Sequence, residues 1–193
     1  MRRPVRDALQ FLVFVSCTLA ARSSVADHYV VPTGSMIPTV LVEDHVVVNH
    51  LAYDVHLPFT NMSLWAHGTP ARGDVVTLTS PEDGKRLLKR VVAVPGDEVR
   101  VRNGRLMIGG QLAAMDAQGR EILGPVVHAV RLTAGGGRDF GPAVVPSGRY
   151  LVMGDNRGES HDGRMFGFVD RTAITGRAIG VFWRSDGLAW QPL

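Results

Sequence analysis

Residues 86–97 read RLLKRVVAVPGD, and this stretch indicates the kind of fold that the chain adopts. A β-strand over this run places every second side chain on one face. That face holds one charged residue among apolar ones: Leu87, Lys89, Val91 and Ala93. Pro95 and Gly96 follow and favour a turn. The pattern predicts a strand that packs on a core and carries a single lysine on its apolar face.

Short runs rich in Val, Ile and Leu recur beyond residue 27, separated by Gly, Pro, Asp and Asn. The expected strands lie at 46–48, 75–78, 87–94, 98–101, 126–132, 150–153 and 179–183. No amphipathic helix of any length is expected in this part of the chain. The spacing predicts a mostly β body with hairpins. Residues 103–148 are richest in glycine, and we expect an inserted β-ribbon there.

The composition is that of one globular domain, because the chain has 193 residues with 45% hydrophobic and 20% charged residues. A wholly disordered or fibrous chain is excluded. Cys17 is the only cysteine, so an intramolecular disulfide and a zinc site built on several thiolates are excluded as well. The sequence indicates no metal and no cofactor.

The positive net charge of +3 belongs to the amino-terminal segment. Residues 1–26 hold four of the 21 basic residues and one of the 18 acidic ones, so the remaining 17 and 17 cancel. A body without excess positive charge is not expected to bind nucleic acid. Nineteen of the basic residues are arginine, and the two lysines are Lys85 and Lys89.

Residues 8–21 form an uncharged, apolar run that follows three arginines. Three interpretations are open: a cleaved secretory signal, a retained membrane anchor and a buried soluble helix. Fourteen residues are fewer than the ~20 that a spanning helix usually needs, so this segment alone slightly favours the cleaved signal. The arginines predict that the amino terminus is cytoplasmic and that the body lies outside.

Residues 32–39, PTGSMIPT, place Ser35 beside a flexible glycine and between two prolines. Gly34 permits close approach of another chain, and the prolines restrict the loop. This arrangement suits an exposed, firmly held nucleophile, although a single serine in a turn is more often structural.

Lys89 on the apolar face of its strand is a candidate general base. Burial disfavours the charged amine and lowers its pKa, and a neutral amine can accept a proton from a serine hydroxyl. Arginine would stay protonated in the same place. The alternative is a lysine whose stem covers the core while its head reaches water.

Residues 153–164, MGDNRGESHDGR, form a dense polar run. If the run is extended, Ser160, Asp162 and Arg164 point the same way. Asp162 and Arg164 would then pair, and Ser160 would hydrogen-bond a neighbouring amine, which is the support that a lysine base needs. No zinc-protease H-E-x-x-H pattern and no G-x-S-x-G pattern occurs. A Ser-His-Asp triad stays open, with His161 as its best histidine.

Taken in order, these segments resemble the bacterial type I signal peptidases, membrane-bound serine proteases with a Ser-Lys dyad. The resemblance covers 32–39, 44–59, 73–76, 89–97 and 154–164. It implies Ser35 as nucleophile and Lys89 as general base, with the Ser35 N–H and the Thr33 hydroxyl as the oxyanion hole. Ser160 would orient Lys89, and Asp162 and Arg164 would form a supporting ion pair. The residues implied to line shallow pockets for small side chains are Val31, Pro32, Met36, Val40 and Leu88.

The resemblance also implies a division of the chain. Residues 1–26 become a retained, single-pass anchor in the bacterial inner membrane, and the catalytic body lies on the extracytoplasmic face. The catalytic β core is expected at 27–102 and 149–193, with the variable β-ribbon at 103–148 between its parts. Leu57, Phe59 and Trp65 are candidates to contact membrane lipid.

The implied activity is cleavage of signal peptides from exported preproteins after small-x-small motifs, by an acyl-enzyme route without a cofactor. Two alternatives stay open. One is a specialised relative with the same dyad, such as a conjugative-transfer peptidase or a self-cleaving repressor, although no DNA-binding head precedes the β body. The other is an anchored β module that binds export clients without cutting them.

Overall fold

The computed structural model describes residue 7 and residues 10–13, 26–56 and 63–193. Most of the expected anchor at 1–26 lies outside the described residues, as do Leu57 and Phe59. Within the described ranges, no helix combines the length and the apolar character that crossing a bilayer requires.

The body is mostly β, as the sequence predicted, and its largest sheet has eight strands. Seven follow the order β1-β2-β15-β5-β6-β13-β14, and β16 pairs with β15. All of these pairings are antiparallel. The strands are β1 (Ala26–Val30), β2 (His45–Asn49), β5 (Val75–Thr79), β6 (Arg86–Ala93), β13 (Arg149–Met153), β14 (Val169–Asp170), β15 (Ile174–Arg184) and β16 (Gly187–Pro192).

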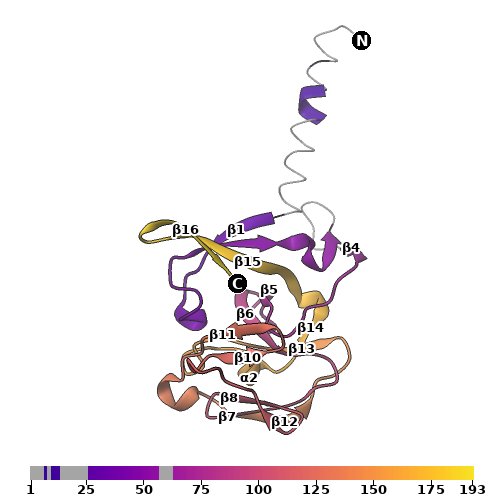
Figure 1. The fold of residues 1–193 in the computed structure, drawn as a ribbon. Coiled ribbons are helices and arrows are strands. Elements are labelled where there is room, and N and C mark those ends of the chain that lie inside the picture. Colours follow the sequence, from indigo (N-terminus) through magenta and orange to yellow (C-terminus); the bar gives the residue numbers. More distant parts are fainter. Residues whose placement is uncertain (1–6, 8–9, 14–25, 57–62) are drawn as a thin grey trace.

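A second sheet has the order β12-β7-β8-β9 and lies at the opposite end of the body from β1 in Figure 1. Its strands are β7 (Glu98–Arg102), β8 (Arg105–Ile108), β9 (Gln111–Leu112) and β12 (Phe140–Val144). Two separate hairpins complete the strands, β3 (Asp54–His56) with β4 (Ser63–Ala66) and β10 (Glu121–Leu123) with β11 (Val126–His128). Residues 103–148 thus supply β8 to β12.

Helical structure beyond residue 26 is confined, in the part of the chain described, to single turns. They are η1 (Gly34–Met36), η2 (His50–Ala52), η3 (Thr133–Gly136), α2 (Gly163–Phe166) and η4 (Arg171–Ala173). The expected strands are all present at their core, but the expected strand at 126–132 ends at His128. After His128, the chain turns to pair Arg131 with Asn156, so the polar run at 153–164 is held against this segment.

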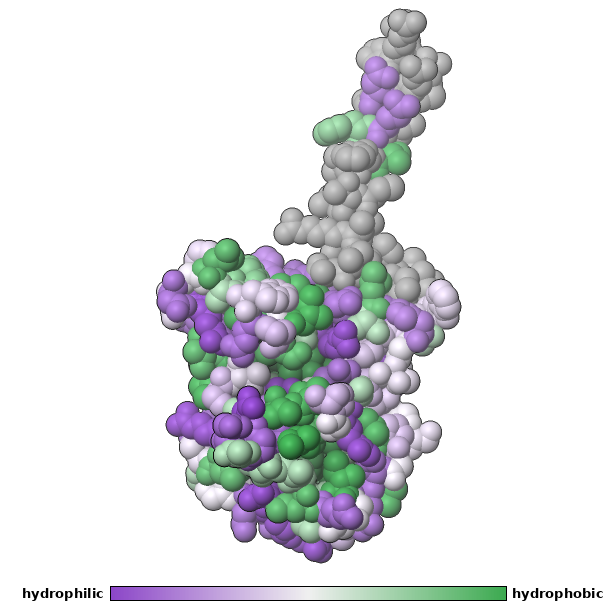
Figure 2. Space-filling model, in the orientation of Figure 1, coloured by the Kyte–Doolittle hydropathy of each residue, from purple (hydrophilic) through white to green (hydrophobic). Residues whose placement is uncertain are grey.

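The core follows from alternation along the strands. In β7 the arginines and Glu98 point outward while Val99 and Val101 are buried, which is the period of two expected for a half-buried strand. These valines pack with Leu151 and Met153 of β13 and so join the two sheets. Figure 2 shows apolar side chains gathered down the middle of one face of the body, between polar margins.

Strand β6 has two different neighbours along its length. Residues 86–90 pair with β5, whereas the pairing with β13 begins only at Arg90. One edge of β6 therefore has no strand partner from Arg86 to Lys89, as far as the described residues go. This open edge lies beside η1, and it is where the lysine identified in the sequence meets Ser35.

Candidate active site

Ser35 is the middle residue of η1, a single turn that the loop 32–39 forms. Asn156 fixes the turn from outside, because its backbone N–H donates to Ser35 O at 3.1 Å and its side-chain amide donates to Gly34 O at 3.1 Å. Only 9% of the Ser35 surface is exposed. The loop and the polar run at 153–164 thus hold the serine in one place.

Lys89 lies opposite this serine. Its Nζ is 2.7 Å from Ser35 Oγ and 3.0 Å from Leu88 O, and the side chain is buried. Burial lowers the pKa of Lys89 to about 8, although the charges of Asp162 and Asp155 act in the opposite direction. With this pKa about a tenth of the amine is neutral at pH 7 and about half at pH 8, and the amine lies within reach of the serine proton.

The oxyanion donors expected from the resemblance lie on the same turn. The N–H of Ser35 is in the first turn of η1, where backbone N–H groups have no acceptor within the helix. Thr33 is the N-cap of η1, but its side chain makes no capping hydrogen bond. Both groups therefore remain available to a developing negative charge at the groove beside Ser35.

A groove of about 420 Å³ extends from Ser35 and Lys89 and is mainly apolar. Of the expected pocket residues, Val31, Pro32 and Leu88 line it. Met36 and Val40 do not line it; both are fully buried and pack in one cluster with Val46 and Val48, which do line it. Their apolar character reflects this packing. The other residues that line the groove are Tyr29, Val30, Thr33, Val46, Val48, Thr77, Lys85, Arg86 and Leu87.

Ser160 does not make the contact that the sequence predicted, which was a hydrogen bond to Lys89. Its buried hydroxyl makes no hydrogen bond to Lys89 within the described residues, so the expected bond is not formed; it acts instead on Asp162, whose pKa it helps to lower. Lys89 is instead directed to Ser35 and Leu88 O. Gly154 separates the two serines, since a Cβ there would lie 2.3 Å from Ser160 Oγ and 2.4 Å from Ser35 O. Only glycine allows this approach.

Asp162 and Arg164 form the expected ion pair, but not through an extended backbone. Asp162 is the N-cap of α2, and Arg164 reaches back from the first turn to donate Nε–H and Nη2–H to both carboxylate oxygens at 2.9 Å. Burial opposes ionisation of Asp162, but the Arg164 guanidinium more than compensates and lowers the pKa of this carboxyl. Asp162 also accepts the Gly154 N–H, which ties the pair to the serine.

Sequence reasoning missed a buried charged network behind the dyad. Arg90, next to Lys89, donates to both oxygens of Asp155, and the two side chains are about 1% exposed. Asp155 also accepts a hydrogen bond from Thr39 at the end of the serine loop. Despite complete burial, the Arg90 charge holds the pKa of Asp155 well below its usual range. The pair therefore connects β6, the serine loop and the polar run.

His128 and Glu121 of the β10–β11 hairpin extend this network. His128 lies 3.3 Å from a carboxylate oxygen of Asp155 and 3.3 Å from one of Glu121, and Arg157 donates to Glu121 at 2.5 Å. Burial would lower the pKa of His128, but the two carboxylates raise it overall. No local pattern indicated this contact, because the hairpin lies within the glycine-rich region, where the sequence predicts only a β-ribbon.

Comparisons with known proteins agree on one family. A family model described as signal peptidase, peptidase S26, matches residues 5–183. A signal peptidase I of Pseudomonas fluorescens is 34% identical over 94% of this chain and 74% of its own length, and one of Pseudomonas aeruginosa is 33% identical over 91% and 70%. A signal peptidase I structure from Enterococcus faecalis has a TM-score of 0.44 and 31% identity, covering 58% of this chain and 98% of that one.

Proposed function

The chain belongs to the signal peptidase family, peptidase S26, and we propose that Ser35 and Lys89 form the dyad with which it cuts. It is a hydrolase of the serine protease class that cleaves signal peptides from exported preproteins. The observation that carries the assignment of the dyad is the 2.7 Å separation between Lys89 Nζ and Ser35 Oγ in a buried setting.

In the proposed mechanism, neutral Lys89 accepts the hydroxyl proton as Ser35 Oγ attacks the scissile carbonyl. The negative charge that develops on the carbonyl oxygen is stabilised by the Ser35 N–H and the Thr33 hydroxyl. The intermediate then collapses to an ester on Ser35, and the protonated lysine gives its proton to the departing amine of the mature chain. Lys89 next takes a proton from water, whose oxygen attacks the ester and releases the signal peptide as a carboxylic acid.

The surrounding ion pairs have a positioning role in this proposal. The Asp162–Arg164 pair holds Gly154 beside Ser35, and the Arg90–Asp155 pair fixes the strand on which Lys89 lies. Ser160 closes the space next to Gly154. The carboxylates of the two pairs, Asp162 and Asp155, raise the pKa of Lys89, but burial lowers it by more.

The substrate groove favours small side chains next to the scissile bond. Val31, Pro32 and Leu88 give the groove an apolar lining beside the nucleophile. We propose that this apolar lining beside Ser35 accommodates the small apolar side chains of the small-x-small motif.

We further propose the membrane arrangement that the sequence favours. Residues 1–26 act as a single-pass anchor with the amino terminus in the cytoplasm, and the body lies on the extracytoplasmic face of the inner membrane. Ala26 begins β1 only nine residues before Ser35, which limits the nucleophile to at most ~30 Å from the anchor. The body then divides into a catalytic core at 27–102 and 149–193 and a ribbon at 103–148.

The test is cleavage of a preprotein by the full chain in detergent. Ser35→Ala and Lys89→Ala should each lose activity by at least about 10³-fold while circular dichroism and melting stay close to wild type. Lys89→Arg should be equally inactive, because arginine keeps its proton. Arg100→Lys is the control, since Arg100 is an exposed basic residue on β7 of the second sheet and does not line the groove. Normal cleavage by a folded Ser35 or Lys89 variant would refute the dyad.

A further inference from the structure

Two cations lie along the groove away from the nucleophile, and only one of them is neutralised. Lys85 pairs with Asp83 at 2.8 Å. Arg86 is exposed and has no carboxylate partner among the described residues; its guanidinium lies 4.5 Å from the centre of the Tyr29 ring. Both Arg86 and Tyr29 line the groove that contains Ser35. An uncompensated positive charge therefore borders the substrate path.

The Tyr29 ring that supports Arg86 is itself held in place. His50 Nδ1 lies 2.9 Å from Thr175 O, and because a carbonyl only accepts, this nitrogen carries the hydrogen. The other nitrogen, Nε2, is then the acceptor for the Tyr29 hydroxyl at 3.1 Å. The ring is fixed through His50 to β15, and Arg86 stacks on a fixed surface, which limits the entropy lost when it binds an anion.

We propose that Arg86, supported by Tyr29, is a specificity-determining residue that binds a carboxylate side chain just before the small-x-small motif of the preprotein. This inference rests on the proposed function. Along β6, Arg86 is three residues from Lys89, or about 10 Å in a strand. In an extended peptide whose scissile carbonyl is at Ser35, the fourth residue before the cut lies three residues, or about 10 Å, from the residue that is cut.

The position in the peptide follows from the lining of the groove. The apolar part, with Val31 and Leu88, lies nearest Ser35 and suits the motif residues, which remain on the enzyme in the acyl intermediate. The part of the groove that contains Arg86 lies farther from Ser35. It is expected to contact the peptide residue just before the motif, which is the fourth residue before the cut. Asp27 also lies near the Tyr29 hydroxyl and contributes to raising its pKa, and its ion-pair partner among the described residues is His28.

The inference is tested with peptides that carry Asp, Ala or Lys at the fourth residue before the cut. Binding is measured by fluorescence anisotropy to the full chain with Ser35→Ala, so that the readout does not depend on turnover. We expect the Asp peptide to bind about threefold to tenfold more tightly than the Lys peptide, with a smaller ratio at high salt. Adding Arg86→Glu should abolish or reverse this preference.

Arg100→Glu is the matched control. It changes the total charge of the chain by the same amount as Arg86→Glu, and Arg100 is an exposed residue of β7 in the second sheet. It should leave the preference unchanged. Equal affinity for the three peptides, no binding of any, or an Arg86→Glu variant with the original preference would overturn the inference. Cleavage of the Ala peptide by the wild-type chain tests the proposed function separately, since it requires the dyad and not Arg86.

Discussion

Lys85 and Lys89 are four positions apart in the chain and have different chemical environments. The Lys85 side chain is 78% exposed and its pKa is raised by its hydrogen bond to Asp83. Lys89 is 3% exposed, and burial lowers its pKa. The difference arises from the groove, which the first lysine borders and into which the second points. Residue type alone therefore does not identify a base; burial and a nearby hydroxyl do.

The pKa of Lys89 predicts how the rate depends on pH. Because the base acts as the neutral amine, kcat/KM should rise with pH and level off above about 8, the pKa of Lys89. Below that value each pH unit should cost about tenfold. The measurement is the pH profile of kcat/KM for a peptide substrate. A rate that is flat between pH 6 and 9, in a buffer-independent assay, would contradict a lysine base.

At the scale of elements, the Arg90–Asp155 pair joins β6 to the polar run and the serine loop. Replacing Asp155→Asn leaves the Arg90 charge buried without its carboxylate, which should cost about 3–5 kcal/mol in the free energy of unfolding. Asp170→Asn removes the exposed partner of Arg149 and should cost less than about 1 kcal/mol. Urea denaturation of the two variants gives the comparison, and equal costs would show that the buried pair does not stabilise the fold.

The strands were predictable because alternation survives in the sequence. Val99 and Val101 of β7, between charged residues, carry the period of two directly, whereas β6 is buried continuously from Lys89 to Ala93. The Asp162–Arg164 pair was also expected, but its helix N-cap geometry was not. Polar residues such as these are common both in extended segments and at the start of a helix, so the sequence did not distinguish the two. Met36 and Val40 were expected in the groove, and only tertiary packing shows that they lie in the core.

The contact of His128 with Asp155 had no sequence signal. The two residues are 27 positions apart, and the hairpin that brings them together is short and rich in common apolar residues. Such long-range pairs depend on how the two sheets and the hairpin pack, which local periodicity does not encode. The deeper part of the site was therefore found only from the fold, whereas Ser35 and Lys89 were candidates from their local patterns and were paired as a dyad by the family resemblance.

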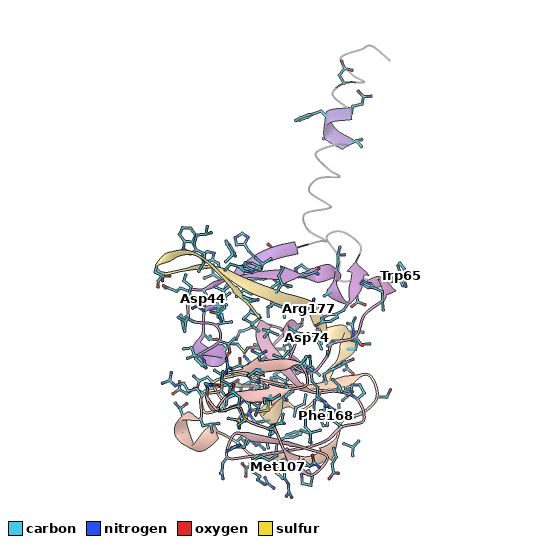
Figure 3. All side chains as sticks on the ribbon, viewed as in Figure 1. Asp44, Trp65, Asp74, Met107, Phe168 and Arg177 are labelled. Carbon is cyan, nitrogen blue, oxygen red and sulfur yellow. The ribbon has the colours of Figure 1, made fainter. Side chains whose placement is uncertain are left out.

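At the scale of the whole molecule, exposed aromatic residues gather at the end of the body where β1 begins. Trp65 of β4 is 70% exposed and Trp190 of β16 is 62% exposed, and both elements lie toward that end, away from β7, β8 and β12 (Figure 1). Figure 3 shows Trp65 at this end and Met107 at the other. Indole side chains favour the membrane interface, so this end is expected to face the bilayer.

This orientation predicts that vesicles made with brominated acyl chains quench the native tryptophan fluorescence of the full chain. All three tryptophans of the chain lie on β4, β15 and β16, so the signal reports on this end of the body. The control is Met107→Trp in a chain with Trp65→Phe, Trp183→Phe and Trp190→Phe, which should stay unquenched. Equal quenching of both chains, or none of the native chain, would reject the orientation.

The central claim is that a neutral Lys89 activates Ser35 as the nucleophile, and trapping the acyl-enzyme tests it most directly. The full chain is incubated with a serine-reactive acylating probe, and peptide mapping by mass spectrometry locates the adduct. We predict an ester on Ser35 in the wild-type chain and at least about 10³-fold slower labelling in a folded Lys89→Met variant. Labelling of another residue, or unchanged labelling of Ser35 in that variant, would contradict the account.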